Sequence, residues 1–118
     1  MSNYLIDASV LPAGFAYPTP FLRLITQNLV DLTPWHILDA DAATERARGL
    51  KARYPGRDYV PFARRQDNDD LAVWEPGTGT DEVVIVHDFA AAGHERRKTI
   101  SFWSWFRCAV DDLIEFEP

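Results

Sequence analysis

Apolar residues alternate with polar ones, or run together without interruption, in the central part of the chain, and this pattern predicts strands. A first strand is expected over Asp70–Glu75 and a second over Val83–His87. Between them, Pro76–Asp81 is polar and contains proline and glycine, so it is expected to form a hairpin turn. Both strands carry apolar residues at successive positions, which predicts a sheet with both faces covered. Leu32–Leu38 is expected to be a further short extended segment.

Apolar residues recur at helical spacing elsewhere in the chain. Thr19 is expected to supply a hydroxyl cap, and a first helix is expected from about Pro20–Asn28. A second helix is expected over Ala42–Arg53, capped by Asp39 or Asp41. Its apolar face is thin, so this helix is predicted to lie on the surface of the molecule.

The last helix has the strongest helical pattern in the sequence. It is expected to begin after Ser101, which can cap it. The tract Ala90–Lys98 before it combines small and charged residues and is predicted to be a loop. The helix carries an apolar stripe formed by Phe102, Phe106, Ala109, Val110, Leu113 and Ile114, which Trp103 and Trp105 broaden. The order of elements predicts a single α+β domain over residues 1–118, with a mostly antiparallel sheet flanked by helices.

Composition and charge narrow the classes of function. The chain has 118 residues, of which 47% are apolar and 25% are charged, as in a globular domain. Its net charge of −6 argues against a nucleic-acid partner, because binding phosphates requires clustered Lys and Arg. The basic residues from Arg46 to Arg57 are interpreted as the solvent face of the second helix. The single cysteine, Cys108, and the lack of an apolar run near the ~20 residues of a membrane span predict a cytoplasmic protein.

No reaction motif is found in the chain. The candidates for zinc binding or nucleophilic catalysis are His36, His87, His94 and Cys108, and their spacing fits neither a zinc finger nor HExxH. An EF-hand starting at Asp67 would need glycine and glutamate where Ala72 and Thr78 stand. No catalytic residue, metal or cofactor is therefore predicted, and a small hydrolase or metal enzyme is the least favoured alternative.

Acidic side chains gather around the predicted hairpin, and a second group ends the chain. The hairpin group is Asp67, Asp69, Asp70, Glu75, Asp81, Glu82 and Asp88; the terminal group is Asp111, Asp112, Glu115 and Glu117. An acidic cluster can steer association with a cationic protein, although it can also be plain solvated surface. The residues predicted to contact a partner are Asp67, Asp69, Asp70 and Glu75, together with Trp74 if it is exposed and not in the core.

Several segments in a fixed order resemble the bacterial SMI1/KNR4 family of the SUKH superfamily. The segments are Tyr54–Arg57, Val60–Trp74 with its Pro-Phe-Ala element, Val83–His87 and Ser101–Phe106. The resemblance covers about Trp35 to Ile114. The N-terminal third departs from the family, since Leu11-Pro12 is not followed by the usual Asn-Gly.

This resemblance implies an α+β fold and a binding function without catalysis. Many bacterial members of the family are immunity proteins, which bind and neutralise a cognate toxin, often a nuclease. Their contact residues vary, so none carries over to this sequence. The chain is therefore expected to bind a basic protein toxin, with a regulatory or scaffold protein as the alternative. Whether it is a monomer or a homodimer is left open by the sequence.

Overall fold

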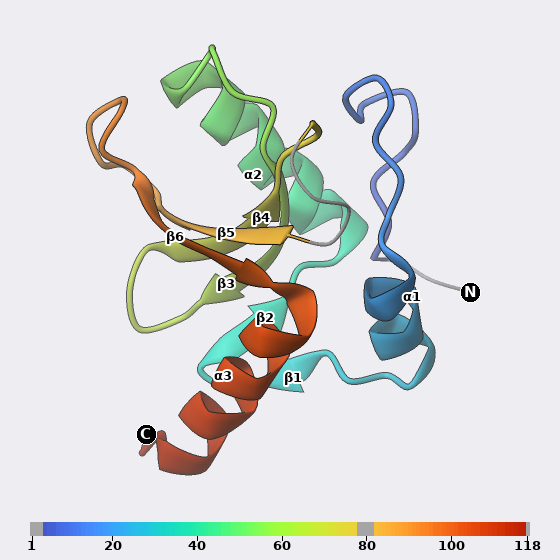
Figure 1. Ribbon diagram of the computed structural model, residues 1–118, viewed down its shortest axis with the longest axis vertical. Coiled ribbons are helices and arrows are strands. Elements are labelled where there is room, and N and C mark those ends of the chain that lie inside the picture. Colours follow the sequence, from blue (N-terminus) through green and yellow to red (C-terminus); the bar gives the residue numbers. More distant parts are fainter. Residues whose placement is uncertain (1–3, 78–81, 118) are drawn as a thin grey trace.

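The computed structural model describes residues 4–77 and 82–117, which form one compact α+β domain. Within these residues, six strands make a single antiparallel sheet in which every strand pairs with the next one along the chain (Figure 1). The strands are β1 (Asp31–Leu32), β2 (Trp35–Ile37), β3 (Val60–Arg65), β4 (Asp70–Trp74), β5 (Glu82–His87) and β6 (Arg96–Ser101). The helices are α1 (Thr19–Thr26), α2 (Ala40–Arg53) and α3 (Phe102–Glu115). The predicted α+β fold with an antiparallel sheet is confirmed.

Helices cover both faces of the sheet, with α2 and α3 on opposite sides (Figure 1). Successive side chains of a strand point to opposite faces, so each central strand contributes to two cores. In β4, Ala72 and Trp74 join the larger core with α1 and α3, whereas Leu71 and Val73 join the smaller core with Leu50 of α2. The prediction of a sheet covered on both faces is confirmed at these strands.

The predicted hairpin is present, and β4 pairs with β5 from Asp70 opposite His87 to Val73 opposite Val84. Gly77 begins the connection with φ +94°, a conformation that favours glycine. The rest of the predicted turn, residues 78–81, lies outside the described residues.

Two strands were not predicted. The β6 strand (Arg96–Ser101) occupies part of the tract expected as a loop, because an exposed edge strand carries charges that hide its pattern. The β3 strand (Val60–Arg65) contains Pro61 beside a register shift and ends in two arginines. The expected segment Leu32–Leu38 is split into β1 and β2 by a turn with a cis Thr33–Pro34 bond.

The helices lie close to their predicted positions, but the predicted Thr19 cap is wrong, because Thr19 is already in α1 and Pro18 stands at its N-cap without a side-chain bond. Asp39 caps α2, since its carboxylate accepts the N–H of Ala42 at 2.8 Å, and α3 begins after Ser101 as expected. The apolar stripe of α3 differs from the prediction at its end, where Leu113 and Ile114 are exposed. The buried residues of α3 are Phe102, Trp105 and Ala109. No helix of the described residues is long and apolar enough to cross a membrane.

Candidate functional site

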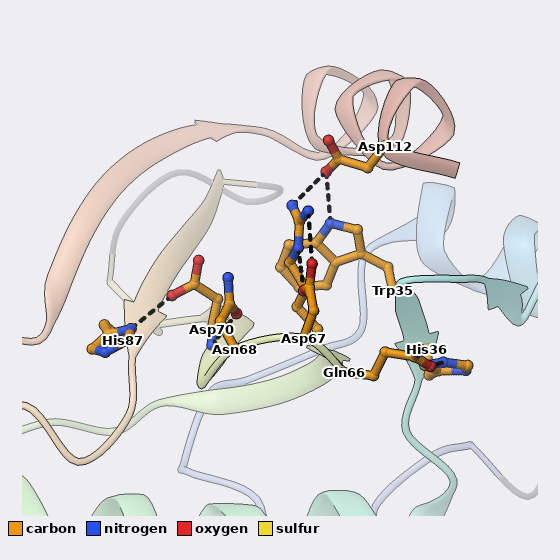
Figure 2. Close-up of polar contacts among 9 residues, drawn as sticks. Trp35, His36, Gln66, Asp67, Asn68, Asp70, His87 and Asp112 are labelled. Carbon is orange, nitrogen blue, oxygen red and sulfur yellow. Dashed lines mark hydrogen bonds and ion pairs between the residues drawn. The ribbon is translucent and has the colours of Figure 1, made fainter. Parts of the chain in front are cut away.

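A hydrogen-bonded acidic turn joins β3 to β4. Asn68 accepts the backbone N–H of Asp70 at 2.8 Å, an Asx turn that holds the loop in shape. The carbonyl of Asp69 accepts the N–H of Asp88 at 3.0 Å, which ties the turn to the end of β5. Figure 2 shows Asp67, Asn68 and Asp70 side by side at this turn. Three of the predicted partner-binding residues, Asp67, Asp69 and Asp70, are therefore brought together.

Arg65 clamps this turn to helix α3. Its Nε donates to Asp67 at 2.6 Å, and its Nη1 donates to Asp112 at 3.0 Å. Asp112 also accepts the indole N–H of Trp35 at 3.0 Å, so its carboxylate is fixed from two sides (Figure 2). The acidic turn and the acidic end of α3, distant in sequence, thus form one surface. We name Asp67, Asp69, Asp70 and Asp112 the acidic face.

The clamp favours the charged form of Asp67. The hydrogen bond from Arg65 lowers the pKa of this carboxyl below its ordinary value, and in return it raises the pKa of Arg65. Asp67 is therefore ionised at neutral pH. One arginine is bound by two carboxylates here, so the cluster keeps a net negative charge.

Two histidines lie beside the acidic face on different strands. His87 lies 3.0 Å from Asp70, and His36 is hydrogen-bonded to Gln66 (Figure 2). They stand on β5 and β2, with β3 and β4 between them, and Cys108 is exposed on α3. Among the described residues no group of three His, Cys, Asp or Glu side chains could hold a metal ion.

Trp74 is a core residue, so the partner contact predicted for it is wrong and the alternative, core packing, is confirmed. Only 3% of its surface is accessible, and its ring stacks on Phe62 with 4.1 Å between centroids. Phe21 and Tyr17 meet the same indole edge-on. The alternation along β4 places Trp74 on the face that α1 and α3 cover, so its side chain cannot reach a partner at the surface.

Glu75 does not belong to the acidic face either. It lies just beyond Trp74, about 13 Å or more along β4 from Asp70 at ~3.3 Å per residue. Its carboxylate pairs with Arg96 at 2.8 Å and with Arg57 at 3.3 Å. The predicted hairpin cluster is thus divided between the two ends of the strand.

Two further acids of the predicted clusters lie elsewhere. Asp88 is fully buried and accepts two hydrogen bonds from Arg53, at 2.7 and 2.6 Å. The basic residues of α2 are therefore not all solvated, since Arg53 is bound to a buried partner. Asp81 lies outside the described residues.

The connection between Arg65 and Asp112 could not be read from the sequence. The two residues are 47 positions apart, and no spacing rule links a strand end to a distant helix. The only signal in the sequence was that acidic residues are concentrated both around the hairpin and at the end of the chain.

Comparison of the chain with family models, with curated proteins and with solved structures finds no match.

Proposed function

We propose that this chain is a non-catalytic binding protein that recognises a basic protein partner through the acidic face. The observation that carries the proposal is the clamp of Arg65, which holds Asp67 and Asp112 in one fixed arrangement. Carboxylates held this way lose little conformational entropy when a cationic partner arrives, so the surface is prepared for binding.

Charge supports the same proposal at longer range. The chain carries a net charge of −6, which attracts a basic protein and raises the rate of encounter. Asp69 is exposed at the tip of the turn, where a partner's Lys or Arg can pair with it. Complementary charge also fixes the orientation in which two proteins dock.

The resemblance to the SMI1/KNR4 family suggests which partner this is. We infer that the chain acts in the cytoplasm as an immunity protein, and that its partner is a basic toxin, such as a nuclease, that it neutralises. A basic nuclease cleft is a chemical match for clustered carboxylates. The second candidate, a regulatory or scaffold protein, uses the same face on a different cellular partner.

The first experiment identifies the partner and tests the face. Tagged protein is used to capture partners from a lysate of its own host, and mass spectrometry identifies what elutes at high salt. With the captured partner, Asp69→Lys should slow association about several-fold, because it places a cation at the centre of an anionic surface. Surface plasmon resonance or stopped-flow fluorescence measures the association rate.

The matched control is Glu45→Lys, which makes the same change of charge on exposed α2, on the opposite side of the sheet. An association rate that falls equally in both variants, or in neither, would sink the acidic face as the contact surface. A captured basic protein whose toxicity the chain suppresses supports the immunity proposal. A captured protein without toxicity favours the regulatory one.

A further inference from the structure

Helix α3 presents an apolar flank that packs on neither the sheet nor α2. Trp103, Arg107, Val110 and Ile114 follow one another at intervals of four, three and four residues, the spacing of a helix seam. Ile114 is 74% exposed, and Trp103 is also accessible. We name these four residues the α3 flank. By contrast, the other exposed side of the helix carries the polar or small residues Ser104, Cys108 and Glu115.

A hollow beside the first half of the α3 flank extends to helix α1. It has a volume of about 480 Å³, and its lining includes Leu24, Leu29, Trp103 and Phe106 with Arg23 and Arg107. Arg23 lies over the ring of Trp103, with 5.9 Å from its guanidinium carbon to the centroid. Across residues 4–77 and 82–117, neither arginine forms an ion pair. Two cations at the edge of an apolar hollow favour an occupant that is both apolar and acidic.

The second half of α3 has this chemistry itself. Leu113 and Ile114 are exposed apolar residues, and Asp111, Glu115 and Glu117 surround them with negative charge. Figure 1 shows that the last turns of α3 extend past the strands toward the C-terminus, so they are accessible to another molecule. The helix thus carries Arg107 near its middle and acidic residues toward its end.

We propose that α3 packs antiparallel against α3 of a second copy of this chain, across a two-fold axis. Antiparallel pairing centred on the α3 flank sets Trp103 opposite Ile114 of the second copy, and it sets Arg107 beside Asp111 of the second copy. Two-fold symmetry makes each of these contacts twice, which closes the dimer. The antiparallel helix dipoles attract each other as well.

The first test is the mass of the intact protein in solution. Light scattering after gel filtration should give twice the chain mass of 13.4 kDa at about 100 µM, falling toward 13.4 kDa on dilution, because dimers dissociate by mass action. Ile114→Arg should raise the dissociation constant about tenfold or more, since it removes an apolar contact with Trp103 and brings a cation toward Arg23, which lies over that ring. Ile114 is largely exposed, so this variant should fold with the melting temperature that the wild-type chain has at a dilution where both are monomeric.

A charge swap makes the test specific. Arg107→Glu alone and Asp111→Arg alone should each weaken the dimer, because each brings like charges together across the axis. The double variant, Arg107→Glu with Asp111→Arg, should restore it, which a merely structural effect would not do. Cys108→Arg is the control, since it adds a cation on the other exposed side of the same helix.

Two results would overturn the proposal. One is a wild-type chain that stays at the monomer mass at about 100 µM, where an interface between copies should be occupied. The other is a dimer that tolerates Ile114→Arg and both single charge changes, because such a dimer uses another surface, for example the edge strand β6.

Discussion

At the scale of single residues, the carboxylate of Glu95 is buried, with 2% of the residue exposed, and so it needs hydrogen-bond donors inside the domain. Tyr59 donates its hydroxyl hydrogen to this carboxylate at 2.7 Å, and the N–H of Gly93 donates at 2.8 Å. Burial raises the pKa of Tyr59 to about 12, with the neighbouring Glu95 adding to the shift, so this tyrosine remains a hydrogen-bond donor at every relevant pH. These two hydrogen bonds stabilise the charged carboxylate of Glu95 inside the domain.

The pKa of Glu95 lies below its ordinary value. Burial, the largest influence, would raise it, but the combined hydrogen bonds from Tyr59 and the backbone N–H groups, with the charge of Arg57, outweigh burial. A lowered pKa in the folded chain means that Glu95 stabilises the fold above the unfolded value of about 4.3. That contribution is lost as the pH falls through the folded pKa.

Tyr59→Phe should therefore destabilise the chain in a manner that depends on pH. The substitution leaves the buried carboxylate without its hydroxyl donor, a loss of about 1–3 kcal/mol in the free energy of unfolding at pH 7. The loss should shrink toward pH 4, because the pKa of Glu95 rises without its donor and the carboxyl then protonates within the fold. Urea unfolding at several pH values, followed by circular dichroism, measures this difference.

Tyr54→Phe is the matched control for this prediction. Tyr54 donates to the carbonyl of Ala90 at 2.7 Å, a neutral acceptor that does not titrate. Its loss should cost the same at pH 4 and pH 7. Equal pH dependence in the two variants would show that Glu95 is not the group that responds.

Residue identity alone did not reveal which charges are buried. Asp88 and Glu95 looked like solvated acids in the sequence, because a carboxylate is rarely buried unless a partner satisfies it. Their partners, Arg53 and Tyr59, lie 35 and 36 positions away. For Trp74 the uncertainty was the reverse. The alternation along β4 was compatible with a buried side chain, but it did not exclude an exposed one.

At the scale of elements, one ion pair joins helix α2 to the end of strand β5. Arg53 is the last residue of α2, and Asp88 follows β5 directly. The guanidinium of Arg53 also lies over the ring of Phe89, 4.1 Å from its centroid. The apolar face of α2 is thin, with Ala43 and Leu50 as its buried residues. We therefore infer that the Arg53–Asp88 ion pair contributes much of the free energy that holds α2 against the sheet.

Arg53→Met should lower the free energy of unfolding by about 3 kcal/mol, because it leaves the fully buried Asp88 without its main partner. Arg46, 3.8 Å from the same carboxylate, offsets part of the loss. Adding Asp88→Asn should recover a part of it, since a neutral amide no longer requires a cation. Chemical denaturation of both variants measures these values.

The control for α2 is Arg48→Met, which removes the same charge from an exposed position of the same helix. Arg48 pairs with Glu45 across 3.7 Å at the surface, so its loss should cost about 0.5 kcal/mol or less. A similar cost at Arg48 and Arg53 would mean that general helix propensity, and not the buried pair, explains the result.

The sequence predicted the elements whose patterns are set by burial. Strands β4 and β5 and helix α3 were expected at nearly their observed positions because their apolar residues face a core. Strand β6 was missed for the opposite reason, since its outer position leaves Arg97, Lys98 and Thr99 exposed. Its backbone pairs with β5, and that pairing is fixed by the neighbouring strand and not by its own side chains.

At the scale of the whole molecule, the two proposed surfaces lie on different sides of α3. Asp112 points toward the sheet, where it meets Trp35 and Arg65, whereas the α3 flank borders α1. The acidic face extends from Asp112 to the β3–β4 turn, away from the hollow between the helices. A dimer formed through the α3 flank would therefore present two acidic faces, both open to a partner.

This arrangement predicts that the two surfaces act independently. Asp69→Lys should leave the dimer mass unchanged, and Ile114→Ala should leave the association rate with the partner, counted per protomer, unchanged. Asp69 stands on the β3–β4 turn and not on α3, and Ile114→Ala adds no charge beside Asp112, which is the physical reason for independence. Light scattering on the first variant and association kinetics on the second measure the two effects. A monomeric Asp69→Lys chain, or slower partner binding by Ile114→Ala, would instead mean that one continuous surface serves both contacts.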